Sequence, residues 1–220
     1  MTPIEAVVFD LDGVLVQSEE LWDAARRELA EEHDIEWPGE ATDAMMGMSS
    51  KEWSKYVHDE VGVPDDPEEI NRKVLAWVEK RYREDLPWID GAREAVKRIG
   101  AEFPLGLATS SNREIIDIVV EVGGFEDLLK VTVSSEEVDK GKPAPDVYLE
   151  ATSRMGVDPR DTAAVEDSTN GLLAARAAGM RVIAIPNDAH PPAEKGLAAA
   201  DVVLDSIDDL TAEVVCGEAS

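Results

Sequence analysis

The 220-residue sequence has a single cysteine, few positive charges and no long apolar run. Cys216 has no second cysteine to pair with, so nothing indicates an oxidising compartment. No apolar stretch approaches the roughly 20 residues of a membrane-spanning helix. The start of the chain leads directly into a strand-like run, without the basic region or cleavage site of a signal peptide. We therefore expect a cytoplasmic protein that does not bind membranes.

Positive charge is scarce: 21 lysines and arginines stand against 48 aspartates and glutamates, and the formal net charge is −27. Such a charge repels nucleic acid and anionic membranes, so we expect neither as a partner. The acidic residues are dispersed among core-like residues, which indicates a solvated acidic surface. We interpret this surface as halophilic, adapted to a salt-rich cytoplasm that screens the self-repulsion. A merely acidic mesophilic protein is the alternative.

Short aliphatic runs recur at the spacing of alternating strands and helices. They are "IEAVVF" (4–9), "PLGLAT" (104–109), "VTVSS" (131–135), "TAAVE" (162–166), "RVIAIP" (181–186) and "DVVLD" (201–205). Amphipathic segments of helix length lie between or after them, which predicts an α/β fold with a Rossmann-like, doubly wound parallel sheet. Ligands of such sheets bind at the carboxyl ends of the strands. The residues after each strand are therefore the candidates for chemistry.

The strand rhythm stops between residues 17 and 88, where the pattern indicates helices. Four apolar residues fall on one face of the first predicted helix: Leu21, Ala24, Ala25 and Leu29. A later helix is predicted to begin at Pro67, which is followed by acidic residues. We predict that residues 17–88 form an all-α cap domain inserted into an α/β core of residues 1–16 and 89–220. The two segments in which the chain passes between core and cap, near residues 17 and 88, are predicted to act as a hinge.

The first predicted strand ends in two carboxylates, Asp10 and Asp12, followed by Gly13. Side-chain alternation sends both carboxylates in the same general direction, where they repel each other unless a cation lies between them. A hydrated Mg²⁺ held by carboxylates, a backbone carbonyl and a substrate phosphate fits this pattern. For an isolated pair, an aspartate that caps a turn is the better interpretation.

Three further strand ends carry polar residues. Thr109 and Ser110 precede a helix, where hydroxyls and free amides suit a phosphate or serve as an ordinary N-cap. Lys142 precedes a proline and could neutralise a phosphoryl group, although a lone lysine is usually solvated, as we interpret Lys140. Glu166 and Asp167 could complete a Mg²⁺ site. Each pattern is weak alone, but all four in this order favour a functional site.

Together these residues resemble the haloacid dehalogenase superfamily of phosphotransferases, and the resemblance covers nearly the whole chain. The four motifs are "DLDG" (10–13), Thr109 in "ATSS", Lys142 in "GKPAPD" and "EDS" (166–168). The chain looks like the branch that includes β-phosphoglucomutase and small sugar-phosphate phosphatases, in which a helical cap follows the first motif. The segments "QSEELWDAA" and "EDSTNGLLAARAAGM" are similar to those of the sugar-phosphate and sugar-alcohol-phosphate phosphatases.

The resemblance implies a Mg²⁺-dependent phosphatase that works through an aspartyl-phosphate. Asp10 would be the nucleophile, and Asp12 would protonate the leaving group and then deprotonate the attacking water. The phosphoryl oxygens would be held by three groups: Thr109, the Ser110 amide and Lys142. The metal would be bound by Asp10, the Asp12 backbone carbonyl and Asp167, with Glu166 as a direct or water-mediated partner.

Two departures from the mutases of this branch favour simple hydrolysis. Trp22 stands where the mutases have a histidine, and Ser50 stands where they have an arginine for the second phosphate. We predict that Trp22, Gly47 and Ser50 face the substrate, with packing inside the cap as the alternative for Trp22.

We therefore expect a monomeric phosphatase of small phosphomonoesters, with sugar or sugar-alcohol phosphates as substrates and phosphoglycolate next. A β-phosphoglucomutase-type phosphotransferase and a non-catalytic sensor of phosphorylated ligands are the alternatives. Net phosphate release distinguishes the phosphatase from the mutase, and turnover distinguishes both from the sensor.

Overall fold

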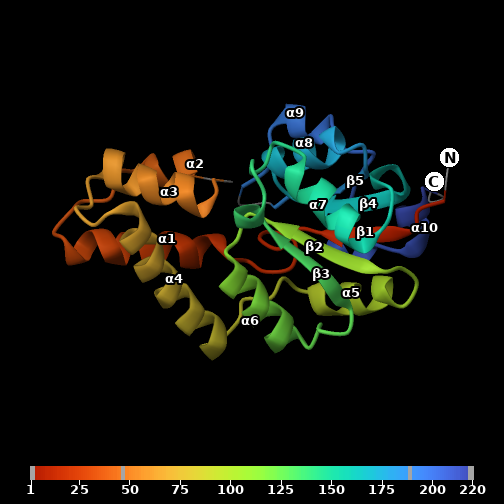
Figure 1. Ribbon diagram of the computed structural model, residues 1–220, viewed down its shortest axis with the longest axis horizontal. Coiled ribbons are helices and arrows are strands. Elements are labelled where there is room, and N and C mark those ends of the chain that lie inside the picture. Colours follow the sequence, from red (N-terminus) through yellow and green to blue (C-terminus); the bar gives the residue numbers. More distant parts are fainter. Residues whose placement is uncertain (1–2, 46–47, 188–189, 218–220) are drawn as a thin grey trace.

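The computed structural model describes residues 3–45, 48–187 and 190–217, and its centre is a parallel β-sheet (Figure 1). The strands are β1 (Ala6–Phe9), β2 (Leu105–Thr109), β3 (Leu129–Ser134), β4 (Thr162–Glu166), β5 (Arg181–Ala184) and β6 (Val202–Val203). Their order is β3-β2-β1-β4-β5-β6. All neighbouring strands are parallel. The chain adds β2 and β3 on one side of β1 and then β4, β5 and β6 on the other, so the strand order switches between β1 and β4. The predicted Rossmann-like, doubly wound fold is confirmed.

The central strands are short and apolar because both faces of the sheet are covered. Every residue of β1 and of β4 is buried. Side-chain alternation divides β1 between two apolar clusters: Val7 and Phe9 pack on one face of the sheet, and Val8 packs on the other. A strand buried on both faces reads as a continuous apolar run, which is how these segments appear in the sequence.

Helices cover the two faces of the sheet separately. One face carries α5 (Ala92–Gly100), α6 (Arg113–Gly123) and α10 (Ala212–Cys216), whose buried residues share a cluster with Phe9. The other carries α7 (Asp146–Met155) and α8 (Thr169–Ala177), whose buried residues surround Val8, with the short α9 (Glu194–Leu197) packed beside α8. The loops at the carboxyl ends of the strands lie at one edge of the sheet (Figure 1).

Among the described residues, four further helices form a lobe beside the sheet, which we call the helical lobe (residues 19–45 and 48–84). They are α1 (Glu19–Glu32), α2 (Ala41–Met45), α3 (Ser50–Tyr56), which continues into a π-helical turn (Val57–Val61), and α4 (Pro67–Glu84). Helix α4 begins at the predicted proline, and Asp66 caps it by accepting a hydrogen bond from the Glu69 amide at 2.9 Å. The predicted inner face of α1 is wrong at Ala24, which is exposed, because Trp22 provides the buried surface instead.

The two segments that connect the helical lobe to the sheet run side by side. Val16 and Trp88 form an antiparallel bridge. The Gln17 amide donates to the Pro87 carbonyl at 2.8 Å, and the Ile89 amide donates to the Leu15 carbonyl at 3.0 Å. These crossings lie near the expected borders of the insertion. The division into two domains that move about them stays a prediction.

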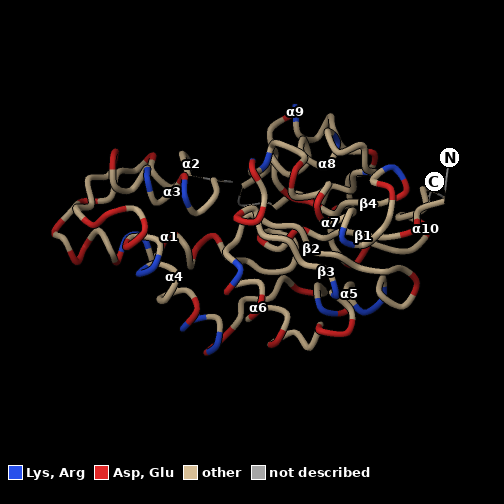
Figure 2. Tube along the Cα trace, viewed as in Figure 1, with Lys and Arg blue, Asp and Glu red and all other residues tan. Residues whose placement is uncertain are grey.

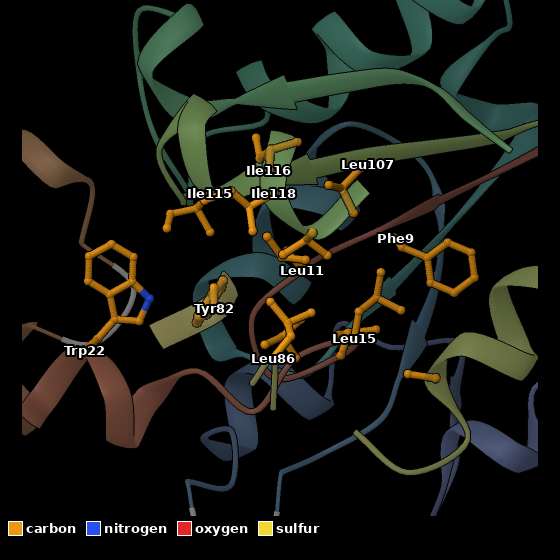
Figure 3. Packing of buried hydrophobic residues seen from close by; sticks show 14 of the residues in the cluster. Phe9, Leu11, Leu15, Trp22, Tyr82, Leu86, Leu107, Ile115, Ile116 and Ile118 are labelled. Carbon is orange, nitrogen blue, oxygen red and sulfur yellow. The ribbon is translucent and has the colours of Figure 1, made fainter. Parts of the chain in front are cut away.

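One apolar cluster continues from the sheet into the helical lobe. Figure 3 shows Phe9 and Leu107 of the sheet, Leu15 and Leu86 of the connecting segments, and Tyr82 of α4 within this cluster. Helix α4 also packs against α6, and Figure 1 shows these two helices side by side. The cluster therefore fixes the helical lobe over the carboxyl ends of the strands.

Acidic residues are spread over both the helical lobe and the α/β part, with far fewer basic residues between them (Figure 2). This distribution agrees with the predicted acidic surface. Within the described part of the chain, every helix is too short or too polar to cross a membrane.

Candidate active site

The strand ends and the helical lobe enclose a cavity of about 410 Å³. Six of the residues predicted to act in the site line it together: Asp10, Asp12, Thr109, Ser110, Lys142 and Asp167. They come from distant parts of the sequence and meet because the carboxyl ends of parallel strands lie at one edge of the sheet. The cavity falls within the size range of small-molecule sites.

The chain after β1 is held closely against β4. The Asp10 amide donates to the Val165 carbonyl at 2.9 Å, so Asp10 continues the ladder of β1 just as the strand reaches the cavity. The next turn depends on Gly13, whose φ is +79°. A Cβ at this position would lie 1.9 Å from an Asp167 carboxylate oxygen. Glycine therefore permits both the turn and the close approach of the two acidic segments.

Lys142 is the buried cation of the strand ends. Its Nζ lies 3.0 Å from Asp10 Oδ1 and 2.6 Å from Glu166 Oε1, and it donates to the Ala108 carbonyl at 3.1 Å. Burial alone would lower the pKa of Lys142, but the carboxylates of Asp10 and Glu166 raise it above its usual value. Lys142 is therefore charged at neutral pH and partly neutralises the acidic cluster.

Glu166 lies behind Lys142 and is fully buried. Its Oε1 accepts from Lys142 and from the Tyr148 hydroxyl at 2.7 Å. Its Oε2 accepts from the amides of Asp167 and Ser168 at 3.1 and 3.2 Å and from the Ser168 hydroxyl at 3.2 Å. Since protein donors already occupy both oxygens, this arrangement favours a role that anchors Lys142 and reaches a metal through water.

The acidic cluster fits a hard divalent cation. Asp10, Glu166 and Asp167 each place one carboxylate oxygen within 4.8 Å of the others. Burial, and then the Glu166 charge, raises the pKa of Asp10 to about 7 and the pKa of Asp167 well above its usual value. Asp12 Oδ1 and Asp167 Oδ1 are buried without a hydrogen-bond partner in the described residues. An oxygen-ligated Mg²⁺ would satisfy Asp167 Oδ1 and offset the charge that Lys142 alone leaves.

Asp12 is held by hydroxyl groups from the end of β2. Its Oδ2 accepts a hydrogen bond from the Ser111 hydroxyl at 2.5 Å and one from the Thr109 hydroxyl at 3.3 Å. The Thr109 hydroxyl in turn accepts from the Ser111 amide at 3.1 Å. Ser111 therefore orients the carboxyl group that is predicted to move protons.

The helical lobe contributes an aromatic wall to the cavity. Trp22 is buried to 8% exposure, and its ring meets the Trp53 ring edge to face, with centroids 6.1 Å apart. Both indoles also line the cavity, so Trp22 packs within the lobe and faces the site at once. Gly47 lies outside the described residues. The Ser50 hydroxyl donates to Glu136 Oε1 at 2.7 Å, and Ser50 is absent from the cavity wall within the described part of the chain.

This contact makes Ser50 a link between the helical lobe and the α/β part. The same Glu136 oxygen accepts from the Asn112 side chain at 3.0 Å, so one carboxylate joins α3 to the segment after β2. The sequence pattern singled out Ser50 but could not show Glu136, which lies 86 residues away.

Arg26 also lines the cavity and was not predicted. It lies one helical turn after Trp22 on α1, which places the two side chains on the same helix face. This spacing is the signal that could have identified it.

Replacing Gly171 by alanine is expected to lower the free energy of unfolding by about 1–3 kcal/mol, because an added Cβ would overlap the buried Glu166 carboxylate. The Cβ would lie 1.7 Å from Glu166 Oε1. Gly39→Ala is the matched control, since a Cβ there meets nothing within 4 Å. Denaturant unfolding of both variants measures the difference, and equal stabilities would contradict the close packing of Glu166 against α8.

Comparisons with known proteins agree with this geometry. The family model described as "Haloacid dehalogenase-like hydrolase" matches residues 7–185. Hexitol phosphatase B of Escherichia coli is 34% identical over 97% of both chains. The phosphorylated carbohydrates phosphatase of Thermotoga maritima is 31% identical, over 82% of this chain and 84% of that one.

A crystal structure of CbbY from Rhodobacter sphaeroides in complex with phosphate superposes with a TM-score of 0.83. It is 27% identical in sequence and covers 94% of this chain and 96% of its own. The family match over residues 7–185 therefore spans most of the sheet, the helical lobe and the acidic strand ends together. The chain belongs to the haloacid dehalogenase-like hydrolase family and, like the curated relatives named here, is a phosphoric monoester hydrolase.

Proposed function

We propose that the protein is a Mg²⁺-dependent phosphatase that hydrolyses small sugar or sugar-alcohol phosphates through an aspartyl-phosphate on Asp10. The observation that carries this proposal is the meeting of Asp10, Asp12, Lys142 and Asp167 in one cavity at the strand ends. A nucleophile, a proton carrier, a cation and a further acidic ligand are the groups that phosphoryl transfer by this route requires.

The chemistry follows from the positions of two carboxyl groups. An Asp10 oxygen attacks phosphorus, the bond to the ester oxygen breaks, and protonated Asp12 gives its proton to the leaving oxygen. The Asp12 carboxylate then removes a proton from water, which attacks the phosphorus of the acyl phosphate. The bond from phosphorus to the Asp10 oxygen breaks, which regenerates the Asp10 carboxylate and releases inorganic phosphate. The Ser111 hydroxyl holds the Asp12 carboxyl in position for both transfers.

Several groups would stabilise the charge on the phosphoryl oxygens. Lys142 neutralises charge beside Asp10, and Thr109 and the Ser110 amide would donate hydrogen bonds from the end of β2. Asp10, the Asp12 carbonyl and Asp167 would hold Mg²⁺, with Glu166 reaching it through water. When bound, this ion would offset negative charge on the phosphoryl group and on the acidic cluster.

The relatives support the substrate class. Hexitol phosphatase B and the phosphorylated carbohydrates phosphatase both act, by name, on phosphorylated carbohydrates or their alcohols. The cavity between the aromatic wall and the strand ends has room for a molecule of this size. The aromatic side chain of Trp22, where mutases of the branch have histidine, supports hydrolysis over isomerisation.

A phosphomonoester panel tests this function. The purified protein is expected to release inorganic phosphate from hexose and hexitol phosphates with Mg²⁺, and to lose this activity in excess EDTA and regain it on adding Mg²⁺. No release from any monoester, or undiminished release in EDTA, would contradict the proposal. Running the panel at low and high KCl tests the proposed adaptation to salt, since full activity and stability without salt would exclude it.

A further inference from the structure

Arg26 of α1 is a charged group on the cavity wall that the proposed mechanism leaves unused. Its guanidinium forms no hydrogen bond or ion pair with any residue that the structure describes, and its Nε is buried without a partner. Two aromatic rings hold it, with Cζ 5.1 Å from the Trp53 centroid and 5.8 Å from the Trp22 centroid. Asp23 and Asp12 are near enough to favour its charge, but neither pairs with it directly, so a bound anion would improve its environment.

The other basic side chains of the described cavity wall already have acidic partners. Lys142 is paired with Asp10 and Glu166. His190 Nε2 lies 3.0 Å from Glu19 Oε2. Arg26 is therefore the cation that this wall leaves available to the part of a substrate that does not react.

The acidic cavity wall is the reason that an available cation matters for an anionic substrate. Asp10, Asp12, Glu19 and Asp167 all line the wall, so an anionic substrate tail would be repelled unless a cation met it. A neutral polyol tail would need no such cation. Burial lowers the pKa of Arg26 to about 10, although Asp23 and Asp12 oppose that shift, and the guanidinium stays charged at neutral pH.

The guanidinium group also has the shape for such a ligand. Its N–H donors lie in a planar fork that matches two oxygens of a carboxylate or phosphate. The indoles of Trp22 and Trp53 restrict its motion, so less conformational entropy is lost when it binds.

We propose that Arg26 binds a second anionic group of the substrate, a carboxylate or a second phosphate, at the end away from the phosphoryl group that is cleaved. This proposal rests on the phosphatase function proposed above and adds a preference, among small phosphorylated carbohydrates, for those with a second anionic group, such as phosphorylated sugar acids and sugar bisphosphates. Arg26 is then a specificity-determining residue, whereas Lys142 serves the phosphoryl group in every substrate.

Two matched substrate pairs test the proposal with the full-length protein and Mg²⁺. Sorbitol 6-phosphate and 6-phosphogluconate differ at the far carbon, which is an alcohol in one and a carboxylate in the other. Fructose 6-phosphate and fructose 1,6-bisphosphate differ by a second phosphate. The parent protein is expected to favour the charged member of at least one pair by roughly 10-fold or more in kcat/KM, and the pair that shows the preference identifies the anion.

The variant Arg26→Met keeps the apolar part of the side chain and removes the charge. For the preferred charged substrate, it is expected to lower kcat/KM roughly 10- to 100-fold, mainly by raising KM. For the neutral substrate, kcat/KM is expected to change by less than about 3-fold. Arg26→Lys is expected to keep part of the preference. Arg27→Met is the matched control, because Arg27 is the next residue of α1, is exposed and pairs with Asp23.

Thermal unfolding shows whether each variant folds, and Arg26→Gln provides a second neutral variant if Arg26→Met does not. Loss of activity on neutral and charged substrates alike would overturn the role of Arg26. A parent protein that hydrolyses sorbitol 6-phosphate but does not prefer either charged substrate would also overturn it, and the phosphatase function would stand. A parent protein that releases phosphate from no monoester would contradict the phosphatase function itself, and this proposal with it.

Discussion

Replacing Asp10 by asparagine is expected to reduce phosphate release by about 10⁴-fold or more, because the amide oxygen lacks the charge of the nucleophile. The substitution preserves the shape of the side chain, so the cavity and its other groups are expected to remain. Initial rates of phosphate release at saturating Mg²⁺ measure the effect. Asp205→Asn, an exposed position of the α/β part, is the matched control.

The Asp10→Asn variant is expected to lose phosphate release without a decrease in its free energy of unfolding. Folding raises the pKa of Asp10 from 3.8 to about 7, so its contribution to stability is present below 3.8 and is lost as the pH rises through 7. Asparagine is neutral throughout this range. At pH 8 and without metal, the variant should therefore unfold with a free energy equal to or above that of the parent. An active Asp10→Asn variant would exclude Asp10 as the nucleophile.

Replacing Lys142 by methionine is expected to remove both activity and much of the stability. The lysine is the buried cation beside Asp10, Glu166 and Asp167, and its loss would leave these carboxylates without that partner. Breaking such a pair costs about 3–5 kcal/mol of unfolding free energy. The rate of phosphate release is expected to fall by at least about 10²-fold, because the charge beside the phosphoryl group is lost.

Lys140→Met is the matched control, because Lys140 is exposed and lies only two residues earlier. It is expected to behave like the parent in denaturant unfolding and in phosphate release. Mg²⁺ is expected to stabilise Lys142→Met more than it stabilises the parent, since the ion replaces part of the missing positive charge. Equal stability of the Lys140 and Lys142 variants would show that the acidic cluster does not depend on Lys142.

The fold was largely predictable because its central strands are buried on both faces. The residues of β1 are all apolar, and those of β4 are apolar between Thr162 and Glu166, so each of these strands appears in the sequence as a short apolar run followed by an acid. The inner face of α1 was less predictable. Alanine is small enough for either face of a helix, and only the packing of Trp22 against Trp53 shows that Ala24 points outwards.

The site was predictable where its residues come directly after strands. Asp10 and Asp167 come directly after β1 and β4, Thr109 is the last residue of β2, and parallel topology alone brings these positions to one edge. Residues from the helical lobe were not predictable in this way. The contact of Ser50 with Glu136 and the exposure of Arg26 to the cavity depend on how the lobe packs against the sheet, which a pattern along the chain does not contain.

The paired segments at Val16 and Trp88 also bear on how the chain folds. Strands β1 and β2 are neighbours in the sheet, yet residues 10–104 separate them. Once Val16 and Trp88 are paired, the loop that remains to be closed consists of residues 10–15 and 89–104. This shortening lowers the entropic cost of joining the two strands by about 1 kcal/mol. A helical lobe that forms early would thus help to bring together the strands whose ends carry Asp10 and Thr109.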